Sequence, residues 1–241
     1  TTIGAFGEAM TQDVTLGGTN FGFDCGYTLC LLTVPAGRIL TVLPGALLDF
    51  HRSFGIAVAS GGSLIAEGTP TQPITFTSRL AAAGDVNQYW IGLWAQQGSA
   101  LRLDYCDISY GSDGNFGNGG LEIDSDDAQV QNCQIHHNQG TGLYLLGPSN
   151  GAARPVLSNV EVTDNGGTGV HLESRYGATL AVVWDGGSIS RNGWSGVTAY
   201  TSSSIVSPTL RSLTIADNGA SGDAPERRGG IYWNQHNVSP D

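Results

Sequence analysis

Lysine is absent from this sequence of 241 residues, and all ten of its basic residues are arginine. Only 13% of the residues are charged, about half of the roughly 25% typical of a globular domain. The arginines are outnumbered by 21 acidic residues, which gives a formal net charge of −11. Binding to nucleic acid or to an anionic membrane requires a basic surface. The charge balance therefore excludes a general nucleic-acid binder and argues against docking on such a membrane.

Long apolar runs and strong helix formers are also scarce. No apolar run approaches the roughly 20 residues that a transmembrane helix requires, so we expect no membrane insertion. Residues 1–10 contain neither a basic segment nor an apolar one, and we expect any signal peptide to have been removed. Val, Ile, Thr and Ser instead form short stretches that are broken by Asn and Gly, a pattern that predicts many short strands joined by tight turns.

The sequence does contain an internal repeat. One aliphatic row recurs at intervals of 27, 27, 27 and 26 residues, an Asn row follows it by three residues, and a Gly row keeps step. The rows are Ile108, Ile135, Val162, Ile189 and Ile215; Asn138, Asn165, Asn192 and Asn218; and Gly142, Gly169, Gly196 and Gly230. An insertion at 219–229 lengthens the last Gly interval to 34 residues, which a loop absorbs at little cost.

A period of 27 residues made of strands and turns predicts a coil of short parallel strands that stack at about 4.8 Å per turn. Equivalent residues then lie above one another, so the apolar rows should face inward. The Asn residues of the turns should adopt the left-handed conformation and form a hydrogen-bonded ladder. Two further inward rows are expected: Leu121, Leu143, Val170, Val197 and Ile231; and Ile123, Leu145, Leu172, Ala199 and Trp233.

The stretch GGSLIAEGTPTQPITFTS, followed by YWIGLW and then by NC-x-I-x-x-N units, resembles the right-handed parallel β-helix repeat proteins of bacterial surfaces, which have the pectate-lyase-like superfamily fold. The resemblance covers roughly residues 33–234. It implies an all-β, single-stranded right-handed parallel β-helix at 33–241, with residues 1–32 as an N-terminal cap, because solenoids need to cover their first core layer. It implies no single function, because that superfamily includes lyases, hydrolases, epimerases, adhesins and passive surface proteins.

The four cysteines fall into two pairs. Cys25 and Cys30 enclose four residues, which favours a small disulfide loop in the cap over a buried free pair. Cys106 and Cys133 are one repeat apart, so their Cα atoms should lie about 4.8 Å apart, within disulfide range, and either a bridge or stacked free thiols fits. Four cysteines with low charge and no lysine indicate an exported protein, extracellular or at the cell surface.

The strand after each repeat Gly should also present two outward rows, because side chains alternate along a strand. Trp and Tyr rings can stack on sugars, whereas carboxylates and imidazoles serve general acid–base catalysis. The candidate ligand-binding residues are Trp94, Tyr144, Tyr200 and Tyr232, and the candidate catalytic residues, if the protein is an enzyme, are Glu122, Asp124, His171 and Glu173. Outward rows of this composition also stabilise ordinary sheets, so a purely structural role is the alternative.

Metal sites are not expected. The segment with Asp124, Asp126 and Asp127 could hold calcium through its clustered oxygens, but a solvated acidic turn is favoured. No CxxC or HxxxH spacing indicates zinc. His136 and His137 follow Ile135 at a turn, where one imidazole should point outward without binding a metal.

Two functions remain in competition. The favoured one is a non-catalytic extracellular β-helix with a structural, adhesive or glycan-binding role. The alternative is a polysaccharide hydrolase or lyase with an acidic groove. Lyases with the resembled fold typically use lysine or arginine as the base. This chain has no lysine, and we find no arginine in its outward rows, which favours the non-catalytic role. A net charge of −11 repels anionic glycans, so a neutral polysaccharide is the expected partner.

The end of the repeat raises a question of assembly. Only residues 235–241 follow the last unit, GGIYWN, too few for another coil. An open last coil exposes strand edges that invite pairing. The segment QHNVSPD could fold back over this end, but continuation of a longer parent chain or end-to-end stacking of another subunit is favoured.

Overall fold

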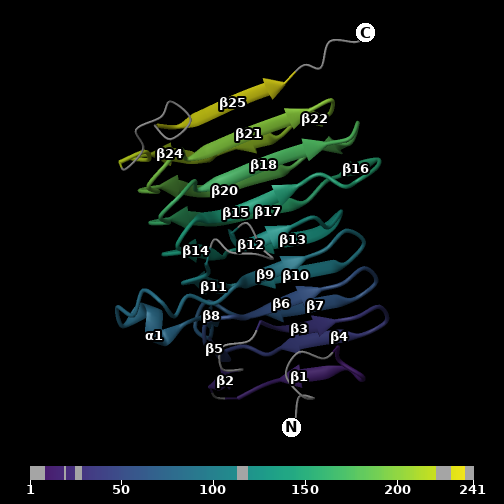
Figure 1. Ribbon diagram of the computed structural model, residues 1–241, viewed down its shortest axis with the longest axis vertical. Helices are drawn as coiled ribbons and strands as arrows, with labels where there is room; N and C mark the ends of the chain where they lie inside the picture. The colour runs from purple at the N-terminus through teal and green to yellow at the C-terminus, as the bar shows by residue number, and fades with distance from the viewer. Residues whose placement is uncertain (1–8, 19, 25–28, 113–118, 221–228, 237–241) are drawn as a thin grey trace.

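The computed structural model describes residues 9–18, 20–24, 29–112, 119–220 and 229–236. Its strands pair in parallel between successive coils, and the coils stack along the long axis from the N-terminal end to the C-terminal end (Figure 1). The predicted parallel solenoid of 27-residue coils is therefore confirmed. In the described residues the one α-helix is α1 (Arg79–Ala82), for which Ser78 is the N-cap.

Each coil contributes one strand to an eight-stranded sheet, which faces the viewer in Figure 1. Its members are β3 (Cys30–Val34), β6 (Phe54–Val58), β9 (Gly92–Ala95), β12 (Gly119–Ile123), β15 (Thr141–Leu146), β18 (Val170–Arg175), β21 (Val197–Ser202) and β25 (Ile231–His236).

The opposite wall is a 14-stranded sheet that consists of two columns. One column is β1 (Val14–Leu16), β4 (Ile39–Val42), β7 (Ser63–Glu67), β10 (Ala100–Asp104) and β13 (Asp127–Gln131); the other is β2 (Phe21–Phe23), β5 (Leu47–Phe50), β8 (Ile74–Thr77), β11 (Cys106–Ser109) and β14 (Gln134–His136). Two long strands, β17 (Val156–Thr163) and β20 (Val183–Ser190), join the columns, which end in β23 (Thr209–Arg211) and β24 (Thr214–Ala216). A small third sheet contains β16 (Ala152–Ala153), β19 (Thr179–Leu180) and β22 (Ile205–Val206).

The apolar rows stack as the repeat predicts. Ile135 pairs with Ile108 on one side and Val162 on the other, and the row continues through Ile189 to Ile215. On the eight-stranded sheet, Leu143 and Leu145 hold the two other rows in register with the neighbouring coils. Burial of these rows is the main source of stability, because apolar surface is removed from water in every coil.

In the less regular first half of the chain, aromatic rings fill the core. Phe50 stacks on Phe23 at a centroid distance of 4.9 Å and on Trp90 at 4.5 Å. Phe54 packs beside them, 5.7 Å from Phe50. These large rings replace the aliphatic rows of the later coils, which explains why the period is harder to read there.

The Asn ladder forms as predicted, with one difference in its backbone. Asn165 Oδ1 accepts hydrogen bonds from the backbone N–H and the amide of Asn138, at 3.0 and 2.9 Å, and Asn192 repeats the arrangement one coil later. The left-handed residue is the one before each Asn, such as Asp164 with φ 57°. We had expected the ladder Asn residues themselves to be left-handed, and that expectation is wrong.

The coil stack begins earlier than expected. β1 already pairs with β4, β2 with β5, and β3 with β6, in the same parallel manner as later coils. Much of the range 1–32 therefore belongs to the solenoid rather than to a separate cap. Its remaining residues 1–8, 19 and 25–28 lie outside the described part of the chain, as do 221–228 of the expected insertion.

Cys106 and Cys133 are buried free thiols, so the alternative of a bridge between them is wrong. The Cys133 thiol donates to the carbonyl of Gln131 at 2.9 Å and accepts from the backbone N–H of Cys106 at 3.4 Å. The Cys106 thiol forms a hydrogen bond with Cys133, and this bond together with burial raises the pKa of Cys106. The raised pKa suppresses the reactive thiolate. Cys25 lies outside the described residues, so a bridge between Cys25 and Cys30 stays a prediction.

At the C-terminal end, the core row is open to solvent. Ile231 and Trp233 on β25 are 55% and 46% exposed, unlike their buried equivalents in earlier coils. Residues 237–241 lie outside the described part, so the expectations for this end stay predictions. No helix among the described residues has the length and apolar character needed to cross a membrane.

Candidate functional site

The candidate residues lie on the outward face of the eight-stranded sheet. The first outward row is in register throughout, because Glu122 pairs with Trp94 and Tyr144, and His171 pairs with Tyr144 and Thr198. In the second row Glu173 lies between Leu146 and Tyr200. The strand register thus brings the predicted residues to one face, where the side chains form two separate groups.

Glu173 is the centre of the first group. Its Oε2 accepts a hydrogen bond from the hydroxyl of Tyr144 and lies 3.5 Å from Nε2 of His171, while Oε1 accepts from Nε of Arg175. The rings of Tyr144 and His171 are stacked, with 4.8 Å between centroids and 2° between planes. Three donors from two neighbouring coils therefore fix one carboxylate.

These contacts set the charge states of the group. Burial by itself would raise the pKa of Glu173, but hydrogen bonds from His171, Arg175 and Tyr144 outweigh it and lower the pKa to about 2. Burial and the hydrogen bond to Glu173 raise the pKa of the Tyr144 hydroxyl far above its usual value. At neutral pH, Glu173 is an ionised acceptor and Tyr144 a neutral donor.

Acidification should remove the stabilisation that Glu173 provides. A folded-state pKa near 2, below the ordinary 4.5, means that the contribution is full above about pH 4.5 and is lost as the pH falls toward 2. A shift of this size corresponds to at most about 3 kcal/mol. We expect urea unfolding of the wild type and Glu173→Gln to differ by about 1–3 kcal/mol at pH 7, and the difference to disappear only as the pH falls through about 2. A difference that is independent of pH would contradict the assigned network.

The second group is built around Asp124. Its Oδ2 accepts a hydrogen bond from the indole N–H of Trp94 at 2.8 Å, and the Glu122 carboxyl lies beside it. Burial raises the pKa of Asp124, although the hydrogen bonds with Trp94 and Glu122 oppose this. Ile123 pairs with Leu145, so Asp124 stands two coils from Glu173, roughly 9.6 Å at about 4.8 Å per coil.

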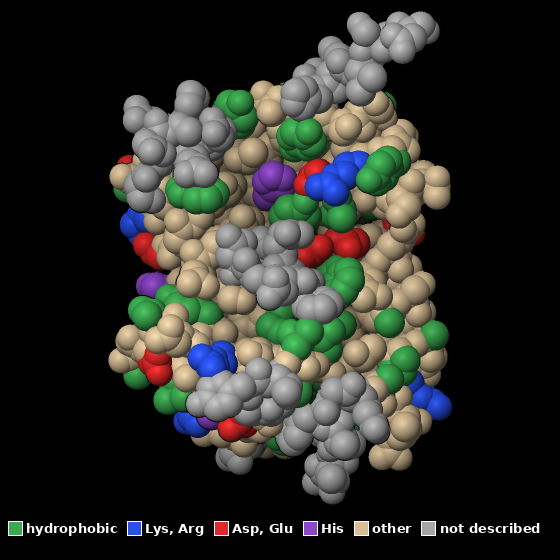
Figure 2. All heavy atoms as spheres, in the orientation of Figure 1, with side chains coloured by type: hydrophobic (Ala, Val, Ile, Leu, Met, Phe, Trp, Pro, Cys, Tyr) green, Lys and Arg blue, Asp and Glu red, His purple; other side chains and the backbone are tan. Residues whose placement is uncertain are grey.

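Each group borders a hollow in the surface. One, of about 450 Å³, is lined by His171, Glu173, Arg175, Tyr176, Tyr200 and Ser202. The other, of about 280 Å³, is lined by Trp94, Gln96, Gln97, Asp124, Leu146, Gly147, Pro148 and Ser149. In Figure 2 a histidine, an acidic and a basic side chain gather in the upper half of this face, where β18 and β21 lie in Figure 1.

The candidate ligand-binding aromatics differ in how much surface they offer. Trp94 and Tyr200 are half-buried and line the hollows, and Tyr232 is half-buried on β25. Tyr144 is only 7% exposed, because its ring lies against His171 and its hydroxyl faces Glu173. Tyr144 is therefore placed to hold its neighbours rather than to present a flat surface to a ligand.

Arg175 and Tyr176 line the larger hollow, but the sequence analysis missed both. We had taken the outward rows to contain no arginine. The strand β18 continues to Arg175, two residues beyond Glu173, so the same alternation that revealed Glu173 could have found Arg175. Tyr176 follows at the end of the strand with 79% of its surface exposed and a left-handed backbone, φ 59°.

The structure does not gather the acidic turn into a cation site. Asp126 and Asp127 are exposed, and Asp127 pairs with Arg102 at 2.6 Å, while Asp124 faces Trp94. Among the described residues, no three His, Cys, Asp or Glu side chains converge on one point.

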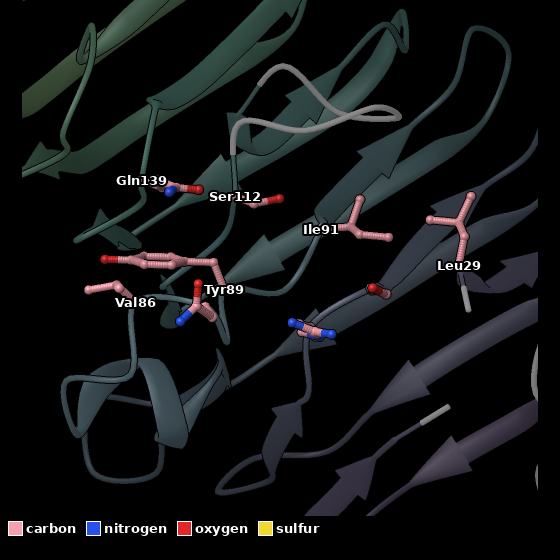
Figure 3. A pocket seen from close by; sticks show the side chains of 9 residues that line it. Leu29, Val86, Tyr89, Ile91, Ser112 and Gln139 are labelled. Carbon is pink, nitrogen blue, oxygen red and sulfur yellow. The ribbon is translucent and has the colours of Figure 1, made fainter. Parts of the chain in front are cut away.

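A further hollow, of about 300 Å³, lies beside the starts of β3, β6 and β9 (Figure 3). Val86, Tyr89, Ser112 and Gln139 border one part of it, and Leu29 and Ile91 the other. It brings together none of the candidate site residues.

Comparison with known families agrees with this architecture. The family described as the right-handed β-helix region matches residues 81–182 and 119–238. Comparisons with curated proteins and with solved structures gave no match. The matched segments cover more than half of the chain and coincide with the coils that carry both groups. On its repeat, its parallel register and this match, the chain belongs to the right-handed β-helix family, whose fold is that of the pectate-lyase-like superfamily.

Proposed function

We propose that this protein is a non-catalytic, extracellular carbohydrate-binding β-helix, and that it binds neutral glycans along the outward face of the eight-stranded sheet. The observation that carries the proposal is the pair of hollows on this face, each of which combines an aromatic side chain with a carboxylate fixed by hydrogen bonds. Aromatic surfaces with a few fixed polar groups are the usual means of orienting a small ligand.

The charge of the face supports a neutral ligand. Glu122, Asp124 and Glu173 place acidic groups on this face of a chain whose net charge is −11. Such a charge repels uronates and sulfated sugars. Arg175, the cation in the larger hollow, is already paired with Glu173. Neutral hydroxyls can donate to the carboxylates and accept from the remaining guanidinium N–H groups. A location outside the cell is consistent with such a ligand and with the low charge of the chain.

Replacement of Tyr200 should weaken glycan binding. Tyr200→Ala removes a half-buried ring from the larger hollow, and we expect a loss of about 0.5–1.5 kcal/mol, or roughly 2- to 12-fold in Kd. The measurement is affinity electrophoresis on a panel of neutral polysaccharides, followed by calorimetry with oligosaccharides of the best one.

Tyr89→Ala is the matched control, because Tyr89 is another half-buried tyrosine, and it lines a hollow that contains none of the candidate site residues. An equal loss in the control, or no wild-type binding to any glycan at millimolar concentration, would count against the proposal.

A second candidate is a glycan hydrolase. It is favoured by the opposite pKa shifts of two carboxylates, raised for Asp124 and lowered for Glu173, which would suit a general acid and a base. Their backbones are roughly 9.6 Å apart, which leaves the carboxyl groups able to approach the spacing of about 6.5–9.5 Å found between the carboxyl groups of inverting glycosidases. A reducing-end assay on the same panel separates the candidates, since a binding module releases no sugar ends.

A further inference from the structure

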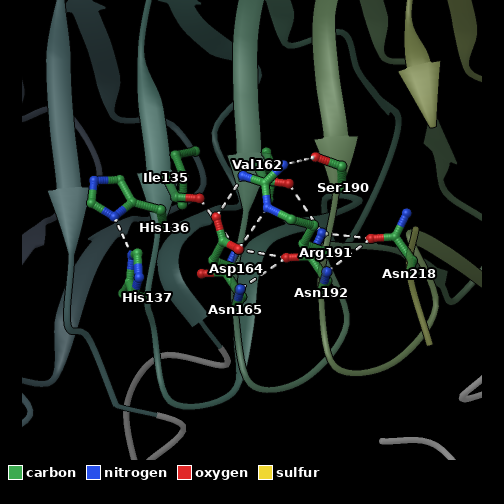
Figure 4. A network of polar contacts seen from close by, with 10 residues as sticks. All are labelled: Ile135, His136, His137, Val162, Asp164, Asn165, Ser190, Arg191, Asn192 and Asn218. Atoms are coloured by element: carbon green, nitrogen blue, oxygen red, sulfur yellow. Dashed lines mark hydrogen bonds and ion pairs between the residues drawn. The ribbon is translucent and has the colours of Figure 1, made fainter. Parts of the chain in front are cut away.

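Contrary to the expectation from the sequence, we propose that His136 and His137 form a binding site for Cu²⁺ at the turn after β14, independent of the glycan face. Nδ1 of His136 lies 2.7 Å from Nδ1 of His137 in a hydrogen bond, so the same nitrogen of both rings lies within reach of a single metal ion. Figure 4 shows this contact between the two rings, whose planes lie at 84° to one another.

The backbone explains why consecutive residues can meet. In an extended strand, neighbouring side chains point to opposite faces. His137 has the left-handed conformation, φ 53°, which ends β14 and turns its side chain toward that of His136. The equivalent positions one and two coils later are Thr163–Asp164 and Ser190–Arg191, so the histidine pair occurs in this coil alone.

Contacts around the pair resemble the outer shell of a metal site. Nε2 of His136 lies 3.1 Å from Oδ2 of Asp107. A neutral His136 that donates its Nε2–H to this carboxylate keeps the lone pair on Nδ1, the arrangement by which carboxylates orient metal-binding histidines. The ring of His137 is held by stacking on Tyr110, with 5.6 Å between centroids and 20° between planes.

Nearby charges favour a cation. The second oxygen of Asp107 is buried without a hydrogen-bond partner among the described residues, so the positive charge of a metal on His136 would offset an incompletely paired carboxylate. Asp164, in the next coil, is engaged by two hydrogen bonds from Arg191, at 2.8 and 2.7 Å, and is not free to be a third ligand. Water would therefore fill the other coordination positions.

The separation of the nitrogens selects the metal. With metal–nitrogen bonds of about 2.0 Å, neighbouring ligands of a square plane lie about 2.8 Å apart and those of a tetrahedron about 3.3 Å apart. The hydrogen-bonded nitrogens, 2.7 Å apart, need less displacement to reach the square plane that Cu²⁺ prefers than to reach the tetrahedron of zinc. On binding, Cu²⁺ takes the place of the proton shared by the two Nδ1 atoms, and His137 carries that proton on Nε2 instead, so both imidazoles coordinate as neutral rings.

The test is titration of the tag-free full chain with CuSO₄ at pH 7.4, followed by calorimetry and electron paramagnetic resonance. We expect one Cu²⁺ per chain, with a spectrum of two coordinated imidazole nitrogens. His136→Gln and His137→Asn should each weaken binding at least tenfold, since each removes one of two protein ligands, and Asn tolerates the left-handed conformation at 137. Asp107→Asn should weaken it about 10- to 100-fold, the usual effect of losing an outer-shell partner.

His51→Gln is the matched control, because His51 also pairs with a carboxylate, Nδ1 to Asp24 at 3.3 Å, but has no second imidazole in the described contacts. It should leave Cu²⁺ binding unchanged. Circular dichroism melting curves would verify that all variants fold. Binding that survives in the His136→Gln/His137→Asn double variant, or that falls equally in the control, would overturn the proposal.

Discussion

Gly169→Ala should destabilise the protein by about 3–5 kcal/mol, although it adds a single methyl group. A Cβ built at Gly169 would lie 2.6 Å from the amide nitrogen of Asn192 and 2.7 Å from the backbone oxygen of Gly196. Neither neighbour can withdraw freely, because the amide belongs to the buried Asn ladder and the oxygen to the next coil. The added atom therefore forces the coil of Gly169 away from the next coil and breaks hydrogen bonds of the Asn ladder. Urea unfolding followed by circular dichroism measures the loss.

Gly230→Ala provides the internal control at the open end of the same Gly row. Among the residues that the structure describes, an added Cβ there meets only the side chain of Ile215, at 4.0 Å, an ordinary contact. We expect a change within about 0.5 kcal/mol, as for other unstrained surface substitutions. Equal losses in the two variants would show that the Gly row is not explained by contact with the ladder.

Asn165→Ala should cost about 2–4 kcal/mol, again without touching the apolar core. The side chain accepts from the backbone N–H of Asn138 and donates to the carbonyl of Ile135, at 3.0 and 3.2 Å (Figure 4 shows Ile135 and the ladder from Asn165 to Asn218). Both Asn138 and Ile135 are buried, so water cannot replace the lost partners without opening the turn. The expected result is a lower urea midpoint, which equilibrium unfolding at neutral pH would measure.

Asn159→Gly is the comparison that separates ladder chemistry from loss of an asparagine. Asn159 is exposed and left-handed, φ 51°, and donates to Asn132 Oδ1 at 2.9 Å. Glycine keeps that backbone conformation, and the lost bond is open to water, so the stability should change by less than about 1 kcal/mol. If Asn159→Gly were as damaging as Asn165→Ala, burial of the ladder would not be the cause.

The sequence by itself determined the coil and its register. In a stack of parallel coils, every residue lies above its equivalent one period earlier, so a row such as Ile135, Val162 and Ile189 encodes a tertiary contact as a sequence interval. The alternation of strand side chains likewise brought Glu122, His171 and Glu173 to one face. A repeat interval does not encode which ligand the protein binds. The proposed function therefore depends on the shape of that face.

The tertiary structure decided what happens within each row. Alternation indicates that Tyr144 points outward, but only the stacked ring of His171 and the carboxylate of Glu173 bury it. Likewise, the spacing of two stacked cysteines is compatible with either a bridge or free thiols. In the structure Cys133 Sγ is directed at the carbonyl of Gln131 in its own coil, and both thiols are free. The convergence of His136 and His137 depends on one left-handed residue at the turn. A repeat interval fixes which backbone positions are neighbours, whereas rotamers, side-chain reach and turn conformation depend on packing against the adjacent coils.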